Sequence, residues 1–378
     1  MKKPIKTLVF LSTSDAAFLA HRVAMADAAH KICRRVVIIC ADTGRMDEIK
    51  KLGFDIHALP AGHRSIFSLL RTVFILVKLY RFEQPQIIHH SSVLMSFIGS
   101  IAGLFYQPAR CINAITGVGY MFSSDSFRAK FLRAVLTPVL RFLWSGEKTV
   151  VLFQNPDDRA LLAKKGLAPF TAPIIRGSGV DIQRFVPVPQ KEPQTEKETP
   201  LIIGCASRLI GDKGLEELIA AVSSFGLQSR FELHIAGSSY AGNPSSFTKE
   251  RVNSWASVEA LRLRGQLRDM PAFWQGCDIA ILPSHREGLP KALLEAAACG
   301  LPLLGADVPG TREIIRHGHN GLLFRKGDAG SIVDAITQMT EDPAFMKLAG
   351  RKSRQMVEKE GFSDDAVGIA YQALLASI

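Results

Sequence analysis

Short apolar runs, each about as long as a buried β-strand, alternate with helix-like segments along the whole chain. Continuous apolar strands between helices are typical of a parallel sheet that is covered by helices on both faces. The alternation occurs twice, so it predicts an α/β protein with two doubly wound, Rossmann-like domains. The strands that we expect are Thr7–Leu11, Val36–Cys40, Ile87–His89, Cys111–Ala114 and Val150–Phe153 in the first half, and Leu201–Cys205, Phe231–Ala236, Ile279–Leu282, Pro302–Leu304 and Leu322–Phe324 in the second.

One compositional break separates the two series. Residues 186–200 are rich in Pro, Glu and Lys, a composition that is typical of a linker or an exposed loop. We expect a first domain over residues 1–183, a linker over 184–200, a second domain over 201–360, and a C-terminal helix over 361–378 that returns to the first domain. Two such domains face a cleft, and ligands bind at the carboxyl ends of their strands.

The sequence also indicates the compartment. No stretch reaches ~18 consecutive uncharged apolar residues, the length that a spanning helix needs. The apolar run Thr7–Leu11 is too short for a signal peptide. The six cysteines form no C-x-x-C pair and mostly lie in apolar runs, so we expect reduced, buried thiols in a cytosolic protein.

Charge is distributed unevenly along the chain, whose net charge is +11. Residues 1–180 contain 24 Lys and Arg against 11 Asp and Glu, whereas residues 181–378 contain 22 against 24. A nucleic acid, an anionic membrane surface or an anionic substrate would each explain the basic half. That half has no recognisable DNA- or RNA-reading motif, so we expect no nucleic-acid partner.

Two segments of the basic half place cations among apolar residues at helical spacing. Residues 64–83 carry Arg64, Arg71 and Lys78 every seven positions, and residues 127–148 place basic side chains beside aromatic ones. Each segment has two interpretations, which the sequence leaves open. It is a helix that lies flat on an anionic bilayer, or a domain helix whose apolar side packs on the sheet while its cations are solvated.

The most informative segment for chemistry is 282–300, where the expected strand Ile279–Leu282 leads through a polar loop into a helix that begins near Pro290. Glu287 lies just before the positive end of that helix, and Glu295 lies in its second turn. Two such carboxylates can grip a sugar hydroxyl and a ribose hydroxyl of one sugar nucleotide. Alternatively, Glu287 is a loop residue near a helix dipole and Glu295 is a surface charge. We expect Glu295 to be half-buried, where an unpaired carboxylate is costly, and this favours a ligand or a partner for it.

A second candidate is the turn between the expected strand Leu201–Cys205 and a helix that starts near Leu215. It contains Arg208 and Lys213, two cations that can flank a diphosphate and stabilise it as a leaving group. The alternative is a solvated basic loop. The segment is not a P-loop, because G-x-x-x-x-G-K-S/T does not occur.

A glycine-containing turn follows the expected strand Cys111–Ala114. Thr116, Gly117 and Gly119 form G-x-G without the third glycine of a dinucleotide loop, so we reject an NAD site. We expect a loop that approaches the cleft closely.

These motifs together resemble the family-4 retaining glycosyltransferases of GT-B fold. The resemblance covers about the whole chain. It rests on the E-x7-E pattern of Glu287 and Glu295 after Leu282-Pro283-Ser284, on Arg208 with Lys213-Gly214, on Gly179-Val180-Asp181 with Phe185, on Cys277-Asp278, and on His319-Asn320-Gly321-Leu322-Leu323. Within the family, residues 115–120 and 127–130 are similar to bacterial enzymes that extend a sugar on undecaprenyl diphosphate for O-antigen, capsule or protein-linked glycans.

The resemblance implies roles for individual residues. Arg208 and Lys213 would hold the donor diphosphate, and Glu287 would contact the donor sugar as the third catalytic residue. The other residues implied in donor binding are Gly204, Arg264, Leu267, Gly288, Leu289 and Glu295. The residues implied to face the acceptor or the cleft are Ser14, Asp15, His21, Arg22, His89, His90, Thr116, Gly117 and Gly119.

One departure from the family pattern concerns the strand Ile87–His89. Many members carry His-x-His after this strand, whereas this chain reads His89-His90-Ser91. The chain also lacks the D-x-D motif with which metal-dependent sugar transferases of the other common fold hold a divalent ion. We therefore expect activity without a metal or cofactor.

The resemblance implies a hexosyltransferase that moves a hexose or an N-acetylhexosamine from a UDP-sugar donor to an undecaprenyl-diphosphate-linked acceptor. Its place would be the cytoplasm, peripheral on the inner, anionic face of the plasma membrane. Two alternatives are a UDP-sugar epimerase of the same architecture and a non-catalytic module that binds sugar nucleotides.

Overall fold

The computed structural model describes residues 5–60, 65–118, 122, 126–187, 200–224, 231–239 and 245–378. The chain divides into two compact units, one formed by Met1–Gly179 with Asp364–Ile378 and one by Val180–Ser363. The division falls at Gly179, four residues before the expected boundary, and the last helix belongs to the first unit.

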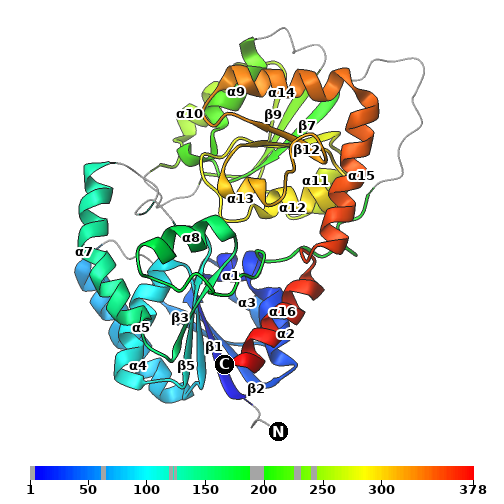
Figure 1. Ribbon diagram of the computed structural model, residues 1–378. Helices are drawn as coiled ribbons and strands as arrows, with labels where there is room; N and C mark the ends of the chain where they lie inside the picture. Colours follow the sequence, from blue (N-terminus) through cyan, green and yellow to red (C-terminus); the bar gives the residue numbers. More distant parts are fainter. Residues whose placement is uncertain are drawn as a thin grey trace. The chain divides into compact units, whose positions relative to one another are not determined.

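The first unit is a six-stranded parallel sheet with the strand order β3-β2-β1-β4-β5-β6. Helices cover both faces of the sheet (Figure 1). Its elements are β1 (Ile5–Ser14), α1 (Asp15–His21), α2 (Val23–His30), β2 (Cys33–Ala41), α3 (Met46–Lys51), β3 (Asp55–Leu59), α4 (Ile66–Glu83), β4 (Ile87–Ser91), α5 (Val93–Tyr106), β5 (Arg110–Ile115), α7 (Phe127–Trp144), β6 (Thr149–Phe153), α8 (Pro156–Lys164) and α16 (Asp364–Ser377).

The second unit repeats this plan with the strand order β12-β11-β10-β7-β8-β9, again with all strands parallel. Its elements are β7 (Leu201–Ala206), the 3-10 turn η1 (Gly211–Lys213), α9 (Leu215–Ser224), β8 (Phe231–Ala236), α10 (Lys249–Ser254), η3 (Trp255–Ser257), β9 (Leu261–Gly265), α11 (Met270–Gln275), β10 (Ile279–Leu282), α12 (Lys291–Ala298), β11 (Leu303–Ala306), α13 (Pro309–Arg312), β12 (Gly321–Phe324), α14 (Ala329–Glu341) and α15 (Pro343–Lys359).

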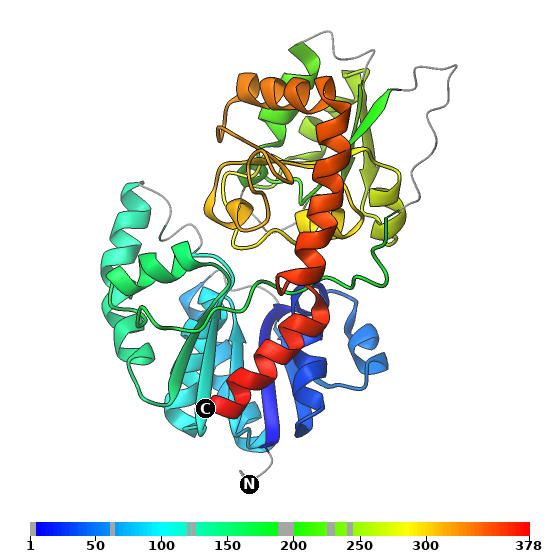
Figure 2. The ribbon, with the colours of Figure 1, turned by 45° about the vertical axis from the view of Figure 1, so that its right-hand side comes forward.

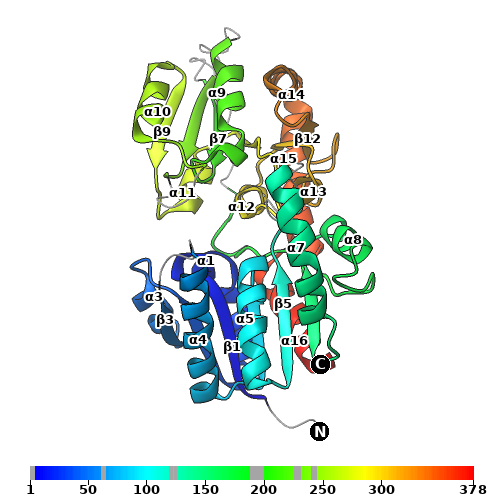
Figure 3. The same cartoon turned by 90° about the vertical axis from the view of Figure 1, so that its left-hand side faces the viewer.

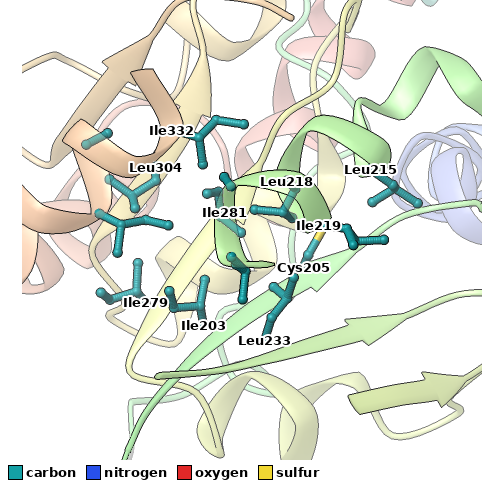
Figure 4. Packing of buried hydrophobic residues seen from close by; sticks show 14 of the residues in the cluster. Ile203, Cys205, Leu215, Leu218, Ile219, Leu233, Ile279, Ile281, Leu304 and Ile332 are labelled. Carbon is teal, nitrogen blue, oxygen red and sulfur yellow. The ribbon is translucent and has the colours of Figure 1, made fainter. Parts of the chain in front are cut away.

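Alternate strand residues build the core on each face of the second sheet. Ile203 and Cys205 of β7 and Ile279 and Ile281 of β10 point to one face, where they pack under α9 and α14 (Figure 4). Residues between them, such as Ala280, point to the other face and pack under α11, α12 and α15. Side chains alternate along a strand, so a strand buried on both faces must be apolar at every position.

The C-terminal helix completes the core of the first unit. Val367, Tyr371 and Leu375 of α16 are buried in the same cluster as Phe10 of β1 and Met25 of α2. Figure 2 shows α16 lying beside α2 on this face of the sheet. The opposite face is covered by α4, α5 and α7, which lie side by side (Figure 3).

Two strands that the sequence did not indicate are β3 and β9. Both lie at a sheet edge and carry exposed polar side chains, among them Asp55 in β3 and Arg262 in β9, so neither reads as an apolar run. All six cysteines are unpaired, and five of them are buried. Among the described residues, no helix is both long and apolar enough to cross a membrane.

Candidate functional site

Several of the predicted donor residues, among them Arg208, Lys213 and Glu287, lie in loops at the carboxyl edge of the second sheet. From the centre of the sheet, β7, β8 and β9 are added one after another toward one edge, and β10, β11 and β12 toward the other edge. The strand order therefore reverses between β7 and β10, which is the topological switch point. Loops diverge at such a point and leave a crevice in which ligands bind. Lys213 follows β7 and Glu287 follows β10, so both lie at this switch.

Lys213 and Glu287 form an ion pair across the switch. The Lys213 ammonium donates to Glu287 Oε1 at 2.5 Å, and the two side chains are only 15% and 12% exposed. The sequence placed these residues in separate loops with separate roles. The structure brings them into direct contact.

Further contacts hold the same two loops together. The His285 backbone N–H donates to the Asp212 carbonyl at 2.9 Å, and Arg286 pairs with the Asp212 carboxylate at 2.6 Å. The His285 ring also bonds Glu217 of α9 at 2.9 Å. Gly214 has φ +64°, and a Cβ there would lie 2.2 Å from the Pro283 carbonyl oxygen, so only glycine permits this approach.

A pocket of about 250 Å³ opens beside these loops, at the ends of β7, β8 and β9. Three predicted donor residues line it, namely Arg208, Leu267 and Glu295. The sequence interpretation missed Ser238 and Gln266, which also line the pocket and hydrogen-bond each other at 3.3 Å. In the sequence, each is marked only as a polar residue just after a strand. Ser238 follows β8, which was expected, and Gln266 follows β9, which was not.

Glu295 is half-buried, as expected, and it has a protein partner. The indole N–H of Trp274 in α11 donates to Glu295 Oε2 at 3.4 Å. The cost of an unpaired carboxylate at this depth predicts a ligand or a partner, and Trp274 is such a partner. The indole fixes the carboxylate in the pocket wall.

The other predicted donor residues lie outside the pocket wall. Gly204 is inside β7, where a Cβ would lie 2.5 Å from Cys277 Sγ, so its small size serves packing. Leu289 is buried in the core between the sheet and α12. Gly288 is buried in the loop before α12, and Arg264 is exposed on β9.

In the first unit, Ser14 and Asp15 organise the loop after β1. The Ser14 hydroxyl accepts from Ala17 N–H and caps α1, while the buried Asp15 accepts the N–H groups of Thr43 and Arg45, each at 2.9 Å. Burial alone raises the pKa of Asp15, but hydrogen bonds from Thr43 and Arg45 outweigh it and hold the pKa below its ordinary value. Asp15 thus remains ionised and secures the loop after β2.

His21 and Arg22 lie at the junction of α1 and α2. The exposed His21 ring bonds the Ser178 hydroxyl at 3.3 Å. The buried Arg22 donates through Nε to Ser91 Oγ at 3.1 Å and through Nη1 to the His21 carbonyl at 2.8 Å. Burial lowers the pKa of Arg22 to about 10, and the nearby Tyr371 hydroxyl opposes this shift.

His89 and His90 are adjacent in β4 and therefore point to opposite faces of the sheet. His89 Nδ1 bonds the Tyr371 hydroxyl of α16 at 2.8 Å. His90 Nδ1 bonds Asn113 Oδ1 at 2.7 Å, and its Nε2 lies 3.4 Å from the Tyr80 hydroxyl. Burial lowers the pKa of His89 well below its ordinary value and that of His90 to about 4, so both rings are neutral at pH 7.

The predicted loop after β5 is described in part. Thr116 and Gly117 are half-buried, and Gly117 adopts φ +143°, a conformation that favours glycine. Gly119 lies outside the described residues.

Three helices of the first unit carry an unusual number of exposed apolar side chains. Phe67 on α4 is 80% exposed, and Phe127 and Phe142 on α7 are 84% and 72% exposed. Arg71 and Lys78 share the exposed side of α4 with Phe67, and Lys78 lies over the Phe74 ring at 4.5 Å. We call the exposed side chains of α4, α5 and α7 the aromatic face; its apolar members are Phe67, Leu70, Phe74, Phe82, Leu94, Leu104, Phe105, Phe127, Phe131, Leu132, Val135, Val139 and Phe142.

The described residues contain no group of three or more His, Cys, Asp or Glu side chains that could hold a metal ion. Charge at the candidate site comes instead from Arg208, Lys213, Glu287 and Glu295.

Two family models match the chain. Residues 189–361 match the model described as Glycosyl transferases group 1, and residues 7–155 match the model described as Glycosyl transferase 4-like. The first match spans the second unit, and the second spans most of the first.

Two relatives align over most of their length. The chain is 23% identical over 343 residues to an N,N'-diacetylbacillosaminyl-diphospho-undecaprenol alpha-1,3-N-acetylgalactosaminyltransferase of Campylobacter jejuni, covering 88% of this chain and 89% of the relative. It is 22% identical over 316 residues to a UDP-Gal:alpha-D-GlcNAc-diphosphoundecaprenol alpha-1,3-galactosyltransferase of Escherichia coli, covering 81% and 80%.

Among solved structures, HepE of Anabaena in complex with UDP-glucose superposes with a TM-score of 0.78 at 16% identity, covering 98% of this chain and 100% of that chain. This likeness, together with the two parallel sheets, confirms the predicted GT-B fold.

The buried state of His90 predicts a pH dependence of stability. Histidine in an unfolded chain titrates near ~6.5, whereas His90 in the fold has a pKa of about 4. The unfolded state therefore binds more protons, and stability is lost as the pH falls from the unfolded value toward the folded one. His90→Gln can still bond Asn113 but does not titrate, so we expect a smaller loss of stability between pH 7 and pH 5.

Urea-denaturation midpoints at the two pH values measure this loss. His319→Gln, at an exposed position, is the control and should behave as the wild type. An unchanged pH dependence in His90→Gln would contradict the prediction.

Proposed function

This chain belongs to the glycosyltransferases that join a glycosyltransferase 4-like domain to a group 1 domain, and we propose that it transfers a hexose or an N-acetylhexosamine from a UDP-sugar to a sugar on undecaprenyl diphosphate. The observation that carries the proposal is the ion pair of Lys213 and Glu287 at the switch of the second sheet, together with a pocket that Arg208 and Glu295 line. The names of the Campylobacter and Escherichia relatives supply the acceptor class.

In this proposal, each part of the donor binds a different group of these residues. The uridine occupies the pocket beside Gln266 and Leu267, with the ribose hydroxyls on Glu295. The diphosphate lies between Arg208 and Lys213, where two cations stabilise the negative charge that develops as the sugar leaves. The transferred sugar then lies next to Glu287.

We further propose a retaining reaction on the front face of the sugar. The acceptor hydroxyl attacks the anomeric carbon on the side from which the diphosphate leaves. The donor phosphate accepts the proton of that hydroxyl, so no side chain is needed as a covalent nucleophile. NMR of the product reads the stereochemistry of the new glycosidic bond and tests whether the configuration at the anomeric carbon is retained.

The assay that tests the proposal combines UDP-glucose, UDP-galactose and their N-acetyl forms with an undecaprenyl-diphosphate-linked sugar. We expect product with at least one donor. UDP-N-acetylglucosamine without acceptor is the control: an epimer in that reaction would favour the epimerase. Nucleotide binding without any product would favour a non-catalytic module.

Removing either cation should impair this transfer. Arg208→Ala and Lys213→Ala should each lose about 2–4 kcal/mol of transition-state stabilisation, which is roughly a 30- to 1000-fold fall in kcat/KM. Arg251→Ala removes an exposed surface cation of the same unit and serves as the control. Near-normal turnover in both site variants would contradict the assignment.

We propose that transfer needs no divalent metal, because Arg208 and Lys213 neutralise the diphosphate. Turnover should persist unchanged in excess EDTA. A loss of turnover that manganese restores would contradict the proposal.

We also propose that the aromatic face docks on the anionic inner surface of the plasma membrane, where a lipid-linked acceptor resides. An apolar patch that is rimmed by cations can bury its rings among lipid headgroups while Arg and Lys pair with lipid phosphates. The exposed rings of α4 and α7 and the excess of basic residues in this half of the chain support it.

Vesicle co-sedimentation tests this docking. Binding to anionic vesicles should weaken as salt is raised, because screening reduces the attraction. Phe127→Ser with Phe131→Ser should also weaken it, whereas Phe170→Ser, exposed outside the aromatic face, should not. Binding that is insensitive to both salt and lipid charge would contradict the proposal.

A further inference from the structure

The ion pair between Lys213 and Glu287 occupies the place where the donor diphosphate needs a cation. The ammonium and the carboxylate are 2.5 Å apart, and solvent reaches little of either side chain. A carboxylate at this distance is the nearest anion to the ammonium, so a phosphate oxygen must compete with it. Glu287 is therefore an anion at the position that a phosphate oxygen of the donor would take beside Lys213.

We infer that Glu287 is an internal counter-ion of Lys213, which the donor diphosphate displaces, and that this exchange releases the Glu287 carboxylate to accept the hydroxyls of the donor sugar. The inference rests on the proposed function, and it adds to it a coupling between the diphosphate and the sugar.

The neighbouring contacts allow this exchange without separation of the loops. Asp212 and Arg286 remain paired at 2.6 Å, and the His285 N–H remains on the Asp212 carbonyl. These contacts join the same two loops one residue away from Lys213 and Glu287. Only the long side chains of Lys213 and Glu287 need to rotate.

The exchange couples the two halves of the donor. When the diphosphate takes Lys213, a largely buried carboxylate loses its partner, which is unfavourable unless other donors replace it. The hydroxyls of the transferred sugar are such donors. UDP without a sugar leaves Glu287 unpaired, and a free sugar finds Glu287 already paired.

Isothermal titration with UDP separates this role from others. Glu287→Gln removes the competing charge and keeps the shape of the side chain, so we expect UDP to bind about three- to tenfold more tightly than to the wild type. Asp212→Asn is the matched control, because it removes the same charge from the adjacent pair. The gain in Glu287→Gln should exceed that in Asp212→Asn.

A double-mutant cycle with Lys213→Met isolates the pair. In that background the lysine is absent, so Glu287→Gln should no longer tighten UDP binding beyond the effect of Asp212→Asn. Circular dichroism of each variant verifies that it is folded before titration.

The outcomes are distinct. Weaker UDP binding by Glu287→Gln would mean that the carboxylate positions Lys213 for the phosphate, and it would overturn the counter-ion role. Equal gains in Glu287→Gln and Asp212→Asn would reduce the effect to general charge and also overturn it. Wild-type protein that binds no UDP or UDP-sugar at all would instead refute the proposed function on which the inference rests.

Discussion

Parallel strands constrain this protein more than any single contact, because every strand in a sheet must end at the same edge. Residues that are far apart in the chain meet at that edge whenever their strands are neighbours. Lys213 and Glu287 are 74 positions apart, yet β7 and β10 pair directly and deliver both to one point. In the first unit, β1 and β4 pair in the same way and bring the loop at Asp15 and the end of β4 to one edge. The arrangement of the candidate site residues thus depends on the burial of two apolar sheets, because the paired strands bring these residues together.

The same constraint explains which parts of the fold were predictable. Strands in the middle of a sheet are covered on both faces and read as continuous apolar runs, so the predicted doubly wound architecture is confirmed. The edge strands β3 and β9 were missed because exposed polar residues, such as Asp55 and Arg262, interrupt their apolar pattern. The other two edge strands, β6 and β12, are mostly apolar and were predicted. Side chains alternate between the two faces of a strand, so adjacent residues in β4 must point to opposite faces. This rule alone places His89 and His90 on opposite faces of the sheet.

The site was predictable in its location but not in its pairing. Sequence spacing places Arg208 and Lys213 in one turn and Glu287 before one helix, because local hydrogen-bonding patterns decide where strands and helices end. Sequence spacing does not show which of these loops contacts which other loop. The partners of Glu295 and Lys213 depend on α11 packing on α12 and on Gly214 passing beneath Pro283, and both are consequences of tertiary structure. The roles of these residues toward a donor stay predictions.

The position of α16 bears on how the chain reaches its native state during synthesis. Residues 364–378 fill the core of the first unit, whereas the second unit is a single continuous segment. A ribosome therefore releases all strands of the first sheet well before α16, which shares one face of that sheet with α2. The second unit is made before α16, whereas Phe10 and Met25 of the first unit lack their α16 neighbours until that helix emerges. The unit that is made first is therefore completed last, and part of its apolar core stays open to solvent for longer during synthesis.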